Sequence, residues 1–143
     1  MIFLTKKAFI LSFASLFIFS CSDNSSRYEK EFYEQISGIC IPGNATIVES
    51  IDNGEFFTAA TFRIDSNDFI RFIHDYKFIK VEKGFGLGFF ADSYLRKDKP
   101  DLRKLANLYY HAGIKGKNSW LYLADIERKL LWAEIQYPDA AAH

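Results

Sequence analysis

Residues 45–64 read ATIVESIDNGEFFTAATFRI. Two runs rich in β-branched and aromatic residues, 45–51 and 55–64, flank the tripeptide Asp52-Asn53-Gly54. Asn-Gly is favoured in tight hairpin turns because both residues tolerate positive φ angles. We therefore predict two antiparallel strands joined by this turn, with side chains alternating between two faces.

Helical patterns lie on both sides of this hairpin. Before it, Tyr28, Phe32 and Ile36 recur at near-helical spacing, and Gly38 suits a C-terminal cap. After it, apolar residues again follow a helical period up to Tyr76, and further on from Pro100, which suits a helix start. The predicted helices are therefore 27–38, 65–76 and 100–112.

The remaining elements are predicted strands: 78–81, a glycine-rich stretch at 84–90, and a second hairpin formed by 120–125 and 130–137. Short turns join most neighbouring strands, which favours an antiparallel sheet. The predicted fold class is α+β: a mainly antiparallel sheet built from two hairpins plus a glycine-rich strand, with the helices packed on one face.

The first twenty residues have the organisation of an export signal. Lys6 and Lys7 precede an apolar run, Ala8 to Phe19, which is long enough for a signal-peptide core but short for a membrane span. Ser20 is a small residue before a possible cleavage point. No second apolar run is long enough to cross a bilayer.

Ile18-Phe19-Ser20-Cys21 resembles the processing site of bacterial lipoproteins, with an aliphatic residue three places before the cysteine and a small one directly before it. The resemblance covers only the leader and Cys21. It implies diacylglycerol on the Cys21 sulfur and an acylated amino terminus, typically palmitate, which together anchor a protein stably. An ordinary secretory signal with a chance cysteine is the alternative.

The residue after the lipidated cysteine influences sorting in this family. Ser22 at that position favours the outer membrane of a Gram-negative cell, facing the periplasm, with the outer leaflet of the inner membrane as the alternative. The predicted organisation is a signal peptide (1–20), a lipidated flexible tether (21–27), a single α+β domain (28–138) and a tail (139–143).

Cys21 and Cys40 are the two cysteines of the chain. In an exported protein a pair of cysteines suggests a disulfide, but a lipid on the Cys21 sulfur would exclude that bond. Under the lipoprotein interpretation Cys40 is a lone thiol, and we expect it to be buried and inert. The two interpretations exclude each other.

Composition excludes some partners. Without the leader, 16 of the 18 Lys and Arg remain against 18 Asp and Glu, a formal charge of about −2. The two signs are interspersed and form no basic stripe, so we expect no nucleic-acid partner.

No catalytic or metal-binding motif stands out. His74, His111 and His143 do not form metal-ligand spacings, and we expect the first two on solvated faces. The carboxylates on or beside strands, Glu49, Asp92, Asp125 and Glu134, give no reason to prefer any one, and Glu134 is expected to be solvated rather than catalytic. Glycines at 84–88 lack the phosphate-loop pattern. We therefore predict no catalytic residue, no metal and no cofactor.

Two aromatic groups are candidate binding surfaces. In the stretch 84–90, Phe85, Leu87 and Phe89 alternate with glycines, so a peptide could add there as a strand, or the stretch is a closely packed core strand. Across the last hairpin, Trp120, Tyr122 and Trp132 could form an aromatic patch, or could pack in the core.

The sequence thus predicts a membrane-anchored, periplasm-facing lipoprotein that is not an enzyme and acts by binding an unidentified periplasmic protein. Class-level analogy suggests an immunity or inhibitor role, or envelope assembly. The alternative is a small periplasmic enzyme or ligand-binding domain with a pocket near 84–90.

Overall fold

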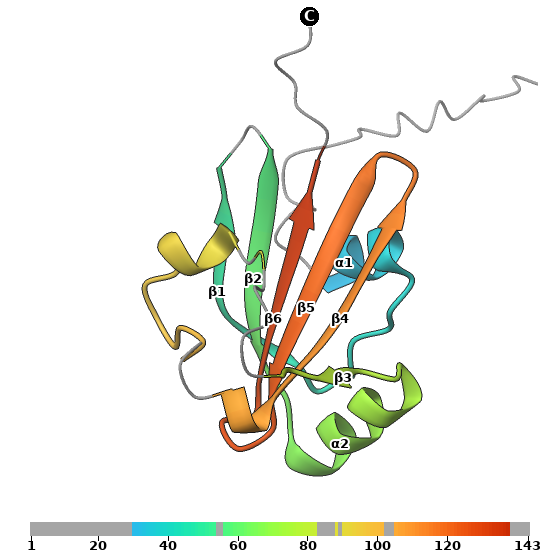
Figure 1. Cartoon of the computed structure of the whole chain (residues 1–143), viewed down its shortest axis with the longest axis vertical. Helices are drawn as coiled ribbons and strands as arrows, with labels where there is room; N and C mark the ends of the chain where they lie inside the picture. The colour runs from blue at the N-terminus through green and yellow to red at the C-terminus, as the bar shows by residue number, and fades with distance from the viewer. Residues whose placement is uncertain (1–29, 54–55, 83–87, 89, 102–104, 138–143) are drawn as a thin grey trace, which may run out of the picture.

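The computed structural model describes residues 30–53, 56–82, 88, 90–101 and 105–137. In these residues six strands form one sheet, in the order β1-β2-β6-β5-β4-β3, and every neighbouring pair is antiparallel (Figure 1). The predicted α+β class and the mainly antiparallel sheet are confirmed. The elements are α1 (Lys30–Ser37), β1 (Thr46–Asp52), β2 (Phe57–Arg63), α2 (Ser66–Asp75), β3 (Ile79–Lys80), β4 (Leu108–Lys115), β5 (Asn118–Asp125) and β6 (Leu130–Gln136).

Both faces of the sheet are covered. On one, the helix face, α1 and α2 pack Tyr33, Phe69 and Phe72 against strand side chains such as Phe62 and Leu131. On the other, which we call the strap face, Ala91 and Leu95 of residues 90–101 pack against Phe57, Leu123 and Trp132. We call residues 90–101 the strap. The second covering layer follows from β2, whose residues Phe57 to Phe62 are small or apolar on both alternating sides and are all buried.

The two α-helices agree closely with the sequence patterns. Gly38 follows α1 with φ +74°, and its N–H donates to the Glu34 carbonyl, which closes the helix as a left-handed cap. In α2, Phe69, Phe72 and Ile73 form the buried stripe. Both helices contribute to the same core cluster, on the helix face.

The third predicted helix, 100–112, is wrong. A short 3₁₀ turn at Leu105–Asn107 leads directly into β4, which pairs with β5 along its whole length. Local spacing favoured a helix, but Leu108 and Tyr110 face the strap side while Tyr109 and His111 face the helices, a period of two. Gly116, with φ +63°, supplies the tight turn that makes β4 the first strand of a hairpin.

Gly113 lies within β4 opposite Trp120 of β5. A Cβ at this position would lie 2.2 Å from Trp120 Cζ2, which is closer than atoms can approach. The glycine therefore provides the space in which the indole ring lies over its neighbouring strand.

Gly113→Ala is expected to lower the free energy of unfolding by about 1–3 kcal/mol, because the added methyl group displaces the Trp120 ring. Urea unfolding measures this. Gly43→Ala is the matched control, since nothing lies within 4 Å of a Cβ there. Equal stability of the two variants would show that the ring is not held over Gly113.

Most of the predicted glycine-rich strand, residues 84–90, lies outside the described residues. Gly88 is exposed, and Phe90 begins a 3₁₀ turn, Phe90–Ser93, which starts the strap. In Figure 1 this turn lies beside β1 and β2, while α2 lies at the end of the molecule near β3.

Candidate functional site

Several predicted site residues lie outside the described residues. These are Cys21 of the lipoprotein motif, Phe85, Leu87 and Phe89 of the glycine-rich stretch, and His143. Their roles stay predictions.

Trp120, Tyr122 and Trp132 do not form one patch. Strand register places Trp120 opposite Ile135 and Tyr122 opposite Ala133, both on the helix face, whereas Trp132 pairs with Leu123 on the strap face. Tyr122 and Trp132 have no exposed area. In this conformation only the half-buried Trp120 could touch a partner.

Tyr122 belongs to a buried hydroxyl cluster between β5 and α1. Its hydroxyl donates to the Tyr33 carbonyl at 3.1 Å and lies 2.9 Å from Ser37 Oγ. Burial raises the pKa of Tyr122 far above its usual range, and does the same to Tyr33. Both phenols therefore stay neutral and act as hydrogen-bonding core residues rather than as acids or bases.

Trp132 fixes the strap to the sheet. Its indole N–H donates to the Asp98 carbonyl at 2.9 Å, and the Arg128 guanidinium lies over the ring, 5.5 Å from its centroid. The Asp98 carboxylate in turn pairs with Arg63 at 3.3 Å and with Arg128 at 3.5 Å. The ring is thus a structural contact between two layers.

Glu134 was expected to be solvated, and this is wrong: the side chain has no exposed area. Its Oε2 accepts the Ala91 N–H at 2.7 Å, and its Oε1 accepts the Gln136 amide at 2.6 Å. Glu134 lies on the strap face, and the layer that covers this face was not predicted from the sequence. Because a buried carboxylate needs hydrogen-bond donors, Glu134 holds the first turn of the strap.

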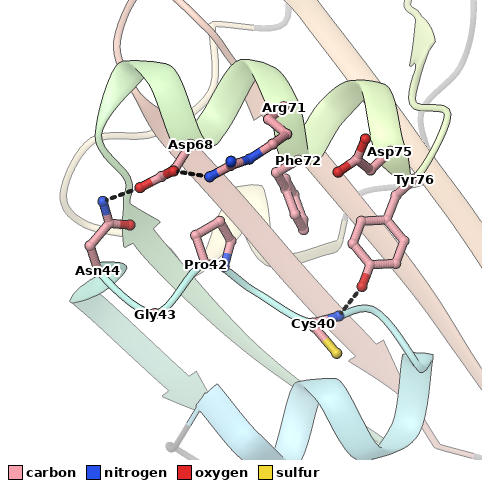
Figure 2. Close-up of a pocket in the computed structure, with 9 residues that line it drawn as sticks. All are labelled: Cys40, Pro42, Gly43, Asn44, Asp68, Arg71, Phe72, Asp75 and Tyr76. Atoms are coloured by element: carbon pink, nitrogen blue, oxygen red, sulfur yellow. Dashed lines mark hydrogen bonds and ion pairs between the residues drawn. The ribbon is translucent and has the colours of Figure 1, made fainter.

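A polar pocket of about 520 Å³ lies where the segment after α1 passes α2. Figure 2 shows its walls: Cys40, Pro42, Gly43 and Asn44 from the segment, and Asp68, Arg71, Phe72, Asp75 and Tyr76 from the helix side. The Cys40 N–H donates to the Tyr76 hydroxyl at 2.8 Å. Asp68 accepts the Asn44 amide at 2.9 Å and pairs with Arg71.

The pocket's groups are mutually paired rather than aimed at its centre. Burial raises the pKa of Tyr76, so its phenol stays neutral. Arg71 is largely exposed and already has a carboxylate partner. The arrangement ties two segments together and offers no nucleophile–base pair among the lining residues.

Cys40 was expected to be buried, and this too is wrong: it is exposed. The chain turns after α1 so that Ile39 and Ile41 on either side are buried, which leaves Cys40 pointing outward. The short apolar segment around Cys40 does not show, from the sequence alone, whether Cys40 or its two isoleucine neighbours face the core.

Cys40 is therefore expected to react with a maleimide in the native protein as fast as a small exposed thiol does, because the residue is exposed. Mass spectrometry of the peptide that carries Cys40 measures the reaction and separates it from Cys21. Labelling that appears only after denaturation would contradict the placement.

Of the histidines, His74 is exposed, as expected. His111 is not on a solvated helix face but on β4, half-buried, with its ring 5.6 Å from that of Phe78 and its Nδ1 3.5 Å from Trp120 Nε1. Burial lowers the pKa of His111. His74 and His111 therefore lie in different environments, the first exposed and the second half-buried.

A second depression, of about 460 Å³, is mainly apolar and lies between α2 and the sheet end. Ile70 on its rim is 54% exposed. We call this the α2 groove; its lining residues are Ile70, Ile73, His74, Lys77, Phe78, Tyr109 and Ile126.

Within the described residues, no three His, Cys, Asp or Glu side chains are grouped so as to hold a metal ion. None of the helices in that part of the chain is long and apolar enough to span a membrane. Comparison with protein families, with curated proteins and with solved structures finds no match to this chain.

Three residues that connect distant segments of the structure could not be recognised from the sequence. Glu49 accepts the N–H groups of Arg96 and Lys97, and Asp98 joins two arginines, yet neither belongs to a motif. Tyr76 was assigned to the α2 stripe, but its contact with Cys40 depends on how the preceding loop folds back. Such long-range pairs follow from the tertiary fold alone.

Proposed function

We propose that the chain is a lipid-anchored protein of the bacterial envelope that faces the periplasm and acts by binding another protein. One observation carries the proposal: the sequence Ile18-Phe19-Ser20-Cys21 behind a short apolar segment, which resembles a lipoprotein processing site. The anchor is a lipid on Cys21. Ser22 favours the outer membrane, and the outer leaflet of the inner membrane is the alternative.

Chain length keeps the folded part close to the bilayer. Residues 22–29 separate Cys21 from the start of α1 at Lys30. At about 3.3–3.6 Å per residue they span at most roughly 29 Å. A partner must therefore be reached near the membrane surface, which suits an immunity or inhibitor protein, or a protein of envelope assembly.

The binding surface that the described residues favour is the α2 groove. The groove is lined mainly by apolar atoms, and the exposed Ile70 on its rim extends the apolar area that a partner could cover. We also propose that Phe85, Leu87 and Phe89 of the glycine-rich stretch add to a contact surface. Binding then requires no cofactor, metal or nucleic acid.

In-cell photo-crosslinking tests this function. A photoreactive residue at Ile70 is expected to trap a discrete partner, whereas the same residue at Ile114 is not. Ile114 is the matched control because it is at least as exposed, at 77%, but lies next to the β4–β5 turn, away from α2 (Figure 1). The proposal would be contradicted if photoreactive residues at Ile70 and Ile114 trapped the partner equally. It would also be contradicted if neither Ile70 nor any position in 84–90 trapped a partner.

The second candidate is a ligand-binding or enzymatic domain with a pocket near 84–90. The observation that favours it is Glu134, a fully buried carboxylate whose partner Ala91 directly follows that stretch. A small-molecule ligand that raises the thermal midpoint of the wild type, but not of Glu134→Gln, would favour this candidate over protein binding.

A further inference from the structure

The strap (residues 90–101) is attached to the sheet through side chains. Its Ala91 N–H donates to Glu134, and the N–H groups of Arg96 and Lys97 donate to the Glu49 carboxylate at 2.8–3.1 Å. None of residues 90–101 pairs with a strand. The attachment therefore consists of a few separable contacts rather than a continuous ladder.

The far end of the strap is held in a less favourable backbone conformation. Asp98 has φ +45°, a left-handed region that non-glycine residues rarely adopt. Its carboxylate contacts Arg63 and Arg128, and its carbonyl accepts the Trp132 indole N–H. When these contacts break, Asp98 can return to an ordinary conformation, so release relieves strain.

Polar groups lie trapped between the strap and the sheet. Thr61 has no exposed area, and its hydroxyl makes no hydrogen bond within the described part of the chain. Register places Thr61 opposite Trp132 on the strap face, one strand from the buried Glu134 carboxylate. Burying such groups costs free energy that hydration would return. Water entering under a lifted strap therefore stabilises the open state.

The helix face is constructed differently. There the Tyr122 hydroxyl bonds Tyr33 and Ser37, and Thr58 donates to the Ile51 carbonyl at 2.9 Å. Apolar packing on that face comes from two α-helices with large aromatic side chains. The two covering layers should thus differ in how easily they separate from the sheet.

We propose that the strap is a separately opening unit, which lifts from the strap face while the sheet and the helix face stay folded. The open state exposes Phe57 and Trp132, which have no exposed area in the closed state. This inference does not depend on the proposed function.

Hydrogen exchange of the full-length chain in detergent tests the proposal. The reporters are the strap amides that donate hydrogen bonds, namely those of Ala91, Tyr94, Leu95, Arg96 and Lys97. We expect the free energy of the opening that lets these amides exchange to fall less steeply with urea than the corresponding free energy for β6 amides. Lifting the strap exposes less surface than unfolding the sheet does. Equal urea dependence for both groups would overturn the proposal.

Three variants distinguish strap opening from global unfolding. Tyr122→Phe removes hydroxyl bonds on the helix face, and should speed β6 exchange about tenfold while leaving strap exchange unchanged. Glu49→Gln should speed strap exchange about tenfold. Thr61→Val should slow it roughly threefold or more. The proposal fails if Tyr122→Phe speeds strap and β6 exchange by the same factor.

Discussion

Trp132→Ala is expected to lower the free energy of unfolding by about 3–5 kcal/mol, the largest effect of any single substitution considered for this protein. The side chain is fully buried in the centre of the sheet, and its removal leaves a cavity under the strap. It also removes the donor to the Asp98 carbonyl and the ring under Arg128. Urea unfolding followed by far-UV circular dichroism measures the change without relying on tryptophan fluorescence.

Trp132→Phe separates packing from hydrogen bonding. Phenylalanine keeps an aromatic ring beneath Arg128 but cannot donate to Asp98, so a loss of about 1–2 kcal/mol is expected. Trp132→Ala should then be clearly less stable than Trp132→Phe. A loss below about 1 kcal/mol for the alanine variant would show that Trp132 is not a core residue.

Glu134→Gln is expected to lower the free energy of unfolding by about 1.5–3 kcal/mol. Both carboxylate oxygens accept hydrogen bonds, one from the Ala91 N–H and one from the Gln136 amide. A glutamine has one acceptor oxygen, so its own NH₂ must face one of these donors. Glutamine has nearly the same shape as glutamate, so the change in stability reports the loss of a charged hydrogen-bond acceptor in a buried site. The same urea titration measures it.

Glu31→Gln is the matched control, because Glu31 is exposed on α1. It should change stability by no more than about 0.5 kcal/mol. If Glu134→Gln were equally neutral, or stabilising, the buried carboxylate would not hold the strap. A buried charge that does not stabilise the protein would then favour the second candidate function, in which Glu134 serves a ligand or a reaction.

The sheet could be predicted where local signals agree with tertiary packing. In residues 45–64, β-branched residues and an Asn-Gly dipeptide favour strands and a turn, and β1 pairs with β2 there. In α2 the apolar stripe is the buried one, since Phe69, Phe72 and Ile73 lie against the sheet. These elements are determined by short-range pattern.

The third helix failed because short-range pattern and tertiary pairing disagree at 105–115. Leucine and alanine favour a helix, but the segment completes the sheet beside β5, where Tyr110 packs against the strap-face core and Tyr109 against the helix-face core. Tertiary context overrides weak helix propensity in such a stretch. Gly113 has a packing role there, because it leaves space for the Trp120 ring.

The site residues were harder to predict than the fold. Glu134 and Thr61 are buried because the strap covers their face, and the strap residues that pack there lie thirty or more positions away in the sequence. Cys40 is exposed for the same kind of reason, as its neighbours Ile39 and Ile41 are the residues that reach the core. Whether a polar residue is buried depends on which segment of the fold packs over it.

Intact mass spectrometry of the chain extracted from membranes of a lipoprotein-processing bacterium tests the central claim, that this is a protein anchored through Cys21. The claim predicts a mature chain that starts at Cys21 and carries the added mass of diacylglycerol and an amide-linked fatty acid. Cys21→Ala should leave the chain unlipidated and release it from membranes. A wild-type chain that begins at another residue, or carries an unlipidated Cys21, would contradict the claim.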